Sequence, residues 1–278
     1  MQGMRSGEWD SAPAAVLERA LSILDAFSTD KTELGVSELS RRSGLAKSTT
    51  HRLVGEMVRL GLLEQVGASV RLGMHLFELG QLVPRQRNLK EAALPFLEDL
   101  REATQNNVHL AVLEGIEVVY LEILRVRNSQ PLPSRVGGRM PAHATGVGKA
   151  ILAFSPPEVV KARIDAGLTR RSPYTIIMPG PLTRELRTIA ETGISYDRQE
   201  SAVGIVCAAA PVFATDGAVA AAISVTGRAE RLDIERMAPA VRTAALALTR
   251  HLGGPTSPPG PPAPPASLGE PAAAQPRR

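Results

Sequence analysis

The sequence predicts an α+β fold in two domains, and three observations support this prediction. A helical block comes first, with apolar residues recurring every three or four positions. A second block alternates amphipathic helices with apolar strands that pair around tight turns. The chain has 278 residues, of which 44% are hydrophobic and 22% charged, so it is long and apolar enough for about two cores.

Three helices are expected in the first block. The first, within 16–27, carries one apolar stripe that is expected to face the core: Leu17, Ala20, Leu21, Leu24 and Phe27. A shorter second helix within 36–44 has Ser37 as its expected N-cap and Gly44 as its stop. A third helix is expected over 46–61. Its inward positions are expected to be Thr49, Leu53, Met57 and Leu60.

Two short strands, 62–66 and 69–74, are expected to form a ribbon around a turn at Gly67. Three helices followed by such a ribbon are the parts of a winged helix-turn-helix. An amphipathic segment follows and ends at Pro84, and it is expected to belong to a linker helix. The predicted boundaries are 14–74 for the winged helix-turn-helix domain and 75–90 for the linker helix.

The second block is predicted to form one domain over 91–252, because strand pairs and helices alternate throughout it. A helix is expected over 90–104, with a kink or late start at Pro95. The strands of two expected hairpins are 108–115 with 116–125, and 203–213 with 218–227. The other expected helices are 147–154, one begun by a capping box at Ser155, 182–191, and 233–252 with its stop at Gly253.

The two ends of the chain and its cysteine content indicate which segments are expected to be disordered and in which compartment the protein is expected to work. Residues 253–278 hold nine of the 22 prolines and are expected to form a disordered or polyproline-like tail, and 1–13 a disordered arm. The single Cys207 excludes an intramolecular disulfide. No apolar run approaches the roughly 20 residues that cross a bilayer, and the first residues do not resemble a secretory signal. A cytosolic protein without a membrane partner is expected.

Basic residues concentrate in the expected second and third helices. Residues 41–59 hold five Lys and Arg against one acidic residue, Glu56, whereas 91–252 hold 18 basic and 17 acidic residues. Such a cluster is typical of a surface that binds a polyanion, although a solvated helix face is the simpler alternative. With Gly44 closing a tight turn, the third helix can present its amino-terminal residues to the major groove of DNA. The candidate DNA-binding residues are Arg42, Lys47, Ser48, Thr50, His51 and Arg52, with Arg71 on the ribbon.

The segments 16–27, 35–64 and 71–80, in this order, resemble the DNA-binding half of the IclR family of bacterial transcriptional regulators. The second half, through 132–154, 193–213 and 218–227, resembles the effector-binding domain of that family, which is GAF-like. The resemblance covers roughly residues 14–252. It implies a double-stranded DNA operator as partner and assembly as a homodimer or a dimer of dimers. A winged helix used only for protein contact is the alternative within the same fold.

Three features of the second block suggest a small-molecule site. The backbone amides of Gly146, Val147 and Gly148 are expected to be free at a helix start, where they suit a carboxylate. Asp197 and Cys207 flank one loop. A third feature is a pair of hydroxyl residues at alternate positions of one strand, which project to the same face: Ser224 and Thr226. A glycine-bearing helix start without any ligand remains the alternative for the first feature.

The IclR resemblance implies that a small organic or aromatic acid binds among these residues. The effector-binding residues that it implies are Gly146, Val147, Asp197, Cys207, Ser224 and Thr226, with Leu132 and Met140 as apolar walls. Some relatives have serine where this chain has Thr226, whose added methyl group narrows the site. Asp197 would repel an anionic ligand unless it is protonated or accepts a hydrogen bond from a ligand hydroxyl.

An enzyme with Cys207 as nucleophile and His109 or His143 as base is the alternative class of function. Most cysteines inside apolar strands are inert core residues, and the sequence places neither histidine beside this one. The five histidines show no metal-ligand spacing, and no complete phosphate-binding or dinucleotide-binding motif occurs. We therefore expect no catalytic residues, metal or cofactor. The prediction is a regulator whose operator binding responds to an acid.

Overall fold

The computed structural model describes residues 11–28, 30–127 and 132–255, which form two compact units that meet between Arg87 and Asn88. The arm expected over 1–13 and the tail over 253–278 lie mostly outside the described residues. The part of the arm that is described is helical, because the first helix already begins at Ser11. Within the described ranges, every helix is too short or too polar to cross a bilayer.

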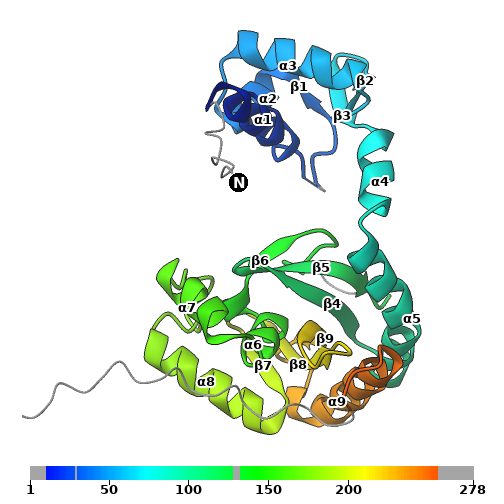
Figure 1. Ribbon diagram of the computed structural model, residues 1–278, viewed down its shortest axis with the longest axis vertical. Helices are drawn as coiled ribbons and strands as arrows, with labels where there is room; N and C mark the ends of the chain where they lie inside the picture. The colour runs from blue at the N-terminus through cyan, green and yellow to red at the C-terminus, as the bar shows by residue number, and fades with distance from the viewer. Residues whose placement is uncertain (1–10, 29, 128–131, 256–278) are drawn as a thin grey trace, which may run out of the picture. The chain divides into compact units, whose positions relative to one another are not determined.

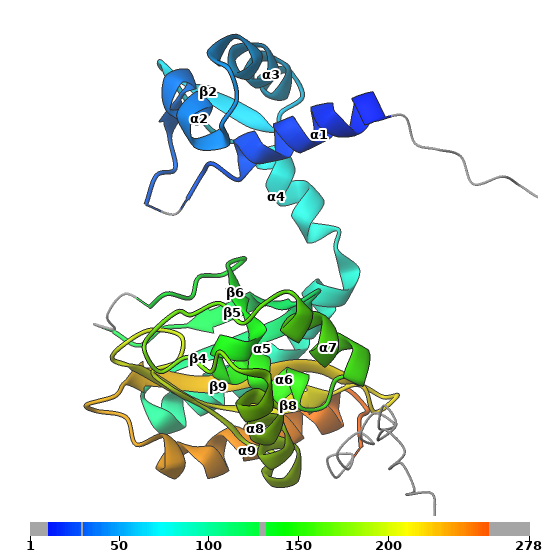
Figure 2. The same cartoon turned by 90° about the vertical axis from the view of Figure 1, so that its left-hand side faces the viewer.

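The first unit is a winged helix-turn-helix (Figure 2). Its elements are α1 (Ser11–Leu24), β1 (Leu34–Gly35), α2 (Val36–Ser43), α3 (Lys47–Arg59), β2 (Leu63–Val66), β3 (Ser69–Leu72) and α4 (Met74–Gln81). The ribbon of β2 and β3 was predicted, whereas the short β1, which pairs with β3 through Leu34 and Val70, was not. One core joins the three helices to this sheet, and its members include Ile23, Phe27, Leu39, Leu53 and Met57.

The inward stripe expected for α1 is wrong in its first half. Leu17 is 71% exposed and Leu21 57% exposed, whereas Ile23 is fully buried. Apolar residues occupy two faces of this helix, so periodicity alone could not identify the face that packs. At its start α2 also differs from expectation. Val36 is its first residue, Gly35 is the N-cap, and no side chain caps it, so Ser37 is not the cap.

In α3 the buried face is rotated by about one position from the expected one. Thr50, Leu53, Val54 and Met57 are buried, while Thr49 is only partly buried. Leu60 is 54% exposed, because the helix ends at Arg59 and the chain turns away. The predicted core contacts of Leu53 and Met57 are confirmed.

The second unit is built on a six-stranded antiparallel sheet of order β6-β5-β4-β9-β8-β7. Its strands are β4 (Asn107–Glu114), β5 (Glu117–Leu124), β6 (Arg139–Pro141), β7 (Ser195–Arg198), β8 (Ile205–Phe213) and β9 (Val219–Arg228). Its helices are α5 (Pro84–Thr104), the 3-10 turn η1 (Ala142–Ala144), α6 (Gly146–Leu152), α7 (Pro157–Asp165), α8 (Pro179–Thr192) and α9 (Ile234–His251). Both predicted hairpins are confirmed, and β6 and β7 are additional edge strands.

Helices cover both faces of this sheet (Figure 1). One core lies between the sheet and the pair α5 and α9, and it includes Leu97, Val108, Val225 and Val241. A separate core lies between the other face and helices α6, α7 and α8, and it includes Tyr120, Ile151, Cys207 and Leu186. Because strand side chains alternate, β4, β8 and β9 send every second residue to the α6 face.

Two helix boundaries in this unit differ from expectation. Helix α5 begins at Pro84 and continues through Pro95, so the segment expected to be one linker helix holds α4 and the start of α5. Proline suits a first helical position because its missing N–H has no partner there. The capping box is wrong: Pro156 is the N-cap of α7. The Ser155 hydroxyl instead donates to the carbonyl of Ile151, 2.9 Å away.

Candidate functional site

The turn between α2 and α3 positions the amino-terminal end of α3. Gly44 ends α2 in the left-handed conformation with φ of 71°, which a glycine adopts without steric cost. The hydroxyl of Ser40 donates to the carbonyl of Leu45 at 2.6 Å and holds the chain after this turn. Helix α3 then begins at Lys47, with its apolar face packed against the core.

The opposite face of α3 is exposed at its amino-terminal end. The exposed residues there are Lys47, Ser48, His51 and Arg52. Within the described part of the chain neither Lys47 nor Arg52 forms an ion pair, so both charges are free for an external anion. An exposed helix start with two free cations and two small or polar side chains suits the major groove.

Thr50 is a correction to the predicted DNA-binding set. It is fully buried, and its hydroxyl donates to the carbonyl of Ala46 at 3.1 Å. Residues three and four apart share a helix face. Thr50 therefore shares the buried face with Leu53 and Val54 and lies off the exposed one.

Arg42 and Arg71 are engaged within the unit. The guanidinium of Arg42 donates to Glu38 at 2.8 Å and to the carbonyl of Ala26 at 2.9 Å. Hydrogen bonds from Arg41 and Arg42 lower the pKa of Glu38 to about 2. Arg71, on the ribbon, is exposed and donates to Glu64 at 2.9 Å. Arg42 thus has a structural role, and Lys47 and Arg52 are the stronger candidates.

A narrow cavity lies on the α6 face of the sheet in the second unit. All eight residues predicted to bind an effector line it: Leu132, Met140, Gly146, Val147, Asp197, Cys207, Ser224 and Thr226. The volume that it leaves for water is about 20 Å³. By this measure one water molecule needs roughly 10–15 Å³, so the cavity has room for about one.

Strand register explains why residues far apart in sequence meet in this cavity. Asp197 pairs with Cys207 across β7 and β8, and Cys207 pairs with Thr226 across β8 and β9. On the next strand, His109 pairs with Ser224. Residues in one such row project to the same face, so the polar groups of four strands converge beneath α6.

The first turn of α6 forms the floor of the cavity. Gly146 lies so close to β8 that a Cβ there would be 2.9 Å from the sulfur of Cys207. The hydroxyl of Thr145 accepts a hydrogen bond from the amide of Gly148 at 3.1 Å. This bond corrects one expectation, because the Gly148 amide is not free. Among the three expected amides, those of Gly146 and Val147 belong to residues that line the cavity.

Asp197 joins the cavity to the loop that follows β7. One of its oxygens accepts hydrogen bonds from the amides of Glu200 at 2.6 Å and Ser201 at 3.3 Å. Burial is the main cause that raises the pKa of Asp197 to about 6. The carboxyl group is therefore poised to change its charge near neutral pH, directly beside a site proposed for an anion.

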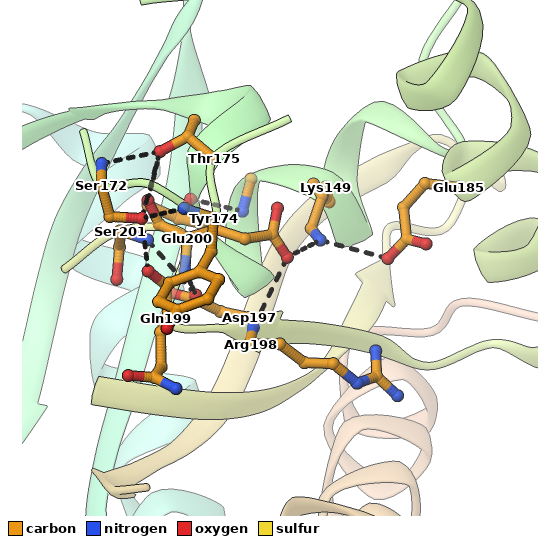
Figure 3. A network of polar contacts seen from close by, with 12 residues as sticks. Lys149, Ser172, Tyr174, Thr175, Glu185, Asp197, Arg198, Gln199, Glu200 and Ser201 are labelled. Carbon is orange, nitrogen blue, oxygen red and sulfur yellow. Dashed lines mark hydrogen bonds and ion pairs between the residues drawn. The ribbon is translucent and has the colours of Figure 1, made fainter. Parts of the chain in front are cut away.

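Beside this loop, the fully buried Lys149 of α6 forms an ion-pair network (Figure 3). Its Nζ donates to Glu200 at 2.5 Å and to Glu185 of α8 at 3.1 Å. The hydroxyls of Thr175 and Ser172 bind the loop as well. Thr175 donates to the carbonyl of Glu200 at 2.7 Å, and Ser172 to that of Gln199 at 2.6 Å. The network ties α6, α8 and the loop together.

His109 is a cavity residue that the sequence suggested only as a catalytic base. Its Nδ1 lies 3.0 Å from the Thr226 hydroxyl and 3.4 Å from the Ser224 hydroxyl. Its Nε2 lies 3.0 Å from the hydroxyl of Ser134. Burial, and after it the charge of Arg125, lowers the pKa of His109 to about 3, so the ring is neutral. The pairing with Ser224 follows from strand register, which sequence patterns do not reveal.

Among the residues that the structure describes, six more line the cavity without having been predicted: Tyr120, Pro133, Ser134, Thr145, Ser201 and Ile205. They come from β5, from the segment before β6 and from the ends of loops. Tyr120 contacts His109 edge-on, with ring centroids 5.3 Å apart. Pro133, Ser134 and Ser201 lie in loops, where no periodic pattern marks a site-facing residue.

The geometry does not support the enzyme alternative. Burial, and secondly the charge of Asp197, raises the pKa of Cys207 to about 12, so its thiol stays protonated. The Nε2 of His143 is engaged elsewhere, because it lies 3.1 Å from the carbonyl oxygen of Thr169. Among the residues that the structure describes, no group of His, Cys, Asp and Glu is arranged to hold a metal ion.

Comparison with known proteins covers both units. Residues 16–67 match the family described as the IclR helix-turn-helix domain, and residues 81–250 match that of the bacterial transcriptional regulator IclR C-terminal domain. The chain is 34% identical over 245 residues to the HTH-type transcriptional regulator XynR of Escherichia coli (strain K12), covering 86% of this chain and 97% of that protein. It is 30% identical over 258 residues to KdgR of the same organism, covering 90% and 98%.

Solved structures show the same relationship. An IclR homolog from Microbacterium hydrocarbonoxydans, complexed with 4-hydroxybenzoate, aligns with a TM-score of 0.78 at 33% identity, covering 85% of this chain and 98% of that one. The IclR of Thermotoga maritima aligns with a TM-score of 0.71 at 29% identity, covering 86% and 99%.

Fold and site together define a DNA-binding transcriptional regulator with a separate effector domain. The chain belongs to the IclR family of bacterial transcriptional regulators. The relatives compared above are regulators rather than enzymes, in agreement with the protonated thiol of Cys207.

Proposed function

We propose that this regulator reads its operator with the exposed start of α3 and responds to a small organic or aromatic acid in the cavity of the second unit. The observation that carries the proposal is the convergence of the eight predicted effector residues, from separate segments of the chain, on one narrow cavity. A neighbouring structure holds 4-hydroxybenzoate, which supports an aromatic acid as the ligand class.

In this proposal, Lys47 and Arg52 contact phosphate or guanine, while Ser48 and His51 approach base edges. Arg71 contacts phosphate beside the groove after exchanging its bond to Glu64. Two free cations at the start of one helix attract the phosphates and fix the position of the helix on the duplex. Small polar side chains permit close approach to the base edges. Effector binding then favours one arrangement of the DNA-reading heads through coupling free energy.

The proposal includes a homodimer or a dimer of dimers on a roughly palindromic operator. Support comes from apolar side chains that the first unit leaves exposed. None of the residues of α4 is buried, and Met74 and Phe77 are 67% and 62% exposed. Helix α1 exposes Leu17 and Leu21 in the same way. A second copy that covers these faces would remove them from water.

Replacing Lys47 or Arg52 by alanine is expected to weaken DNA binding and to flatten its salt dependence. Each lost phosphate contact reduces the slope of log affinity against log salt by roughly 0.9. Fluorescence anisotropy with DNA from upstream of the neighbouring transcription unit measures this slope. The matched control is Arg59→Ala, at the far end of α3, where the guanidinium pairs with Glu56 at 2.7 Å. An unchanged slope in both variants would contradict the recognition surface.

The effector part is tested by screening organic and aromatic acids for a rise in melting temperature. Acids that stabilise the protein are expected to change operator binding in a gel shift. Ser224→Ala should lose this response and keep DNA affinity, because it removes one cavity hydroxyl that is remote from α3 in sequence and belongs to the other unit. Ser155→Ala, a buried serine outside the cavity lining, is the control. Loss of DNA binding by the Ser224 variant would argue against this division of roles.

A further inference from the structure

The cavity is too small for any organic acid, so one wall must move before an effector binds. Its volume of about 20 Å³ accepts about one water molecule. Most of the lining belongs to strands β4 to β9 and to α6 with its N-cap Thr145, whose backbones are hydrogen bonded in the sheet or helix. The two remaining parts of the wall are the loop at Ser201 and the segment 132–134.

These two parts of the wall are held very differently. The loop at Ser201 is fixed by Asp197, by Lys149 through Glu200, and by the hydroxyls of Thr175 and Ser172. Segment 132–134 forms no backbone hydrogen bond to another described backbone group. Its two polar attachments to other described residues are the Ser134 hydroxyl on His109 and the Ser134 carbonyl, which accepts a bond from Arg125 at 3.2 Å. Segment 132–134 is therefore the part of the wall whose displacement costs the least free energy.

The attachment to His109 also shows what an effector must offer. The ring is fixed by hydroxyls at Nδ1 and by the edge of Tyr120, so Nε2 points to one position, which the Ser134 hydroxyl occupies. Displacing that hydroxyl leaves a buried ring nitrogen without a partner, which is costly unless the ligand replaces it. A neutral imidazole binds a hydroxyl or a carbonyl, according to its tautomer.

We propose that His109 determines effector specificity, with Ser134 standing in for the effector. On this proposal, which rests on the effector site proposed above, the ligand is a small acid with a second polar group, a hydroxyl or carbonyl, that displaces segment 132–134 and binds Nε2 of His109. An acid without such a group opens the cavity but leaves Nε2 unpaired. We therefore expect the protein to bind hydroxy or keto acids more tightly than acids that lack such a group.

The displacement step is tested without any ligand, through the single Cys207, which lines the cavity. The rate at which methyl methanethiosulfonate labels this thiol in the full-length protein reports how often the cavity opens. Ser134→Ala removes the bond to His109 and is expected to raise the rate roughly tenfold, the effect of one buried hydrogen bond. Ser155→Ala should leave the rate unchanged. An unchanged rate in Ser134→Ala, or labelling that occurs only through global unfolding in denaturant, would overturn the role of the segment.

Specificity is tested with matched acids that differ in one hydroxyl, 4-hydroxybenzoate against benzoate and 3-hydroxybutyrate against butyrate. The hydroxy acid of a pair should protect Cys207 at roughly tenfold lower concentration. His109→Asn, which keeps an atom near Nδ1 and lacks one at Nε2, should abolish this preference, whereas His109→Gln should retain part of it. Equal protection by both members of a pair would overturn the role of His109.

The two proposals fail in different ways. If Ser134→Ala accelerates labelling but no acid protects Cys207, the acid effector is wrong and the movable segment stands. If acids protect Cys207 but Ser134→Ala labels at the unaltered rate, the effector site stands and the movable segment is wrong.

Discussion

Lys149→Met is expected to lower the free energy of unfolding of the effector unit by about 3–5 kcal/mol, the usual cost of removing one partner from a buried ion pair. Lys149 is fully buried and neutralises Glu200, which is itself only 5% exposed. Methionine fills similar space but leaves the carboxylates of Glu200 and Glu185 without their cation. Calorimetry of the full-length protein measures the change in the transition of this unit.

Two variants distinguish charge from packing at this position. Lys161→Met removes an exposed lysine that pairs with Asp165 on α7, and a change of less than about 1 kcal/mol is expected. Adding Glu200→Gln to Lys149→Met should restore part of the lost stability, because it removes one stranded charge. A double variant no more stable than Lys149→Met would show that volume, rather than charge, dominates.

Asp197→Asn is expected to gain stability relative to the unaltered protein as pH rises from about 4 to 7. Burial raises the pKa of Asp197 from its ordinary 3.8 to about 6. Between these values the folded chain retains a proton that the unfolded chain has lost, so rising pH destabilises the folded form. A difference of two pKa units corresponds to a loss of about 3 kcal/mol in the free energy of unfolding of the unaltered protein. Asparagine does not ionise, so the variant does not undergo this loss.

Chemical unfolding at several pH values between 4 and 7 measures this difference. Asp165→Asn, an exposed carboxylate on α7, provides the baseline for losing one surface charge. A difference between the Asp197 variant and the unaltered protein that does not vary with pH would contradict the raised pKa. The same ionisation would weaken the binding of an anionic effector above about pH 6, because a carboxylate would then face a carboxylate.

The elements of the fold that the sequence predicted are those with local signals. Strands β8 and β9 are long apolar runs separated by a turn in which Gly217 has φ of 78°, and α9 has its cap at Asp233 and ends near Gly253. The side of α1 that packs was not predictable in the same way. Leu17 and Ile23 are equally apolar, and only the positions of α2 and α3 decide which of them is buried.

The residues of the candidate site also divide into those with a local sequence signal and those without one. Ser224 and Thr226 stood out as polar residues at alternate positions of an apolar strand, and Asp197 and Cys207 as residues that flank one loop. His109 could not be added to them, because its partner Thr226 lies 117 residues further along the chain. The burial of Lys149 could not be predicted for the same reason. A lysine is expected at the surface unless a distant partner such as Glu200 is known.

The floor of the cavity is backbone, and this limits how the site can change its ligand. Gly146 has no room for a Cβ beside Cys207, and at Gly148 a Cβ would meet the backbone of Ala142. Mutation can therefore do little to the amides that would face a carboxylate in the proposed site. A new chemical preference must come from replacing wall side chains such as His109, Leu132 and Met140. In the proposed site, one rigid anion seat would thus be kept while the walls determine which acid binds.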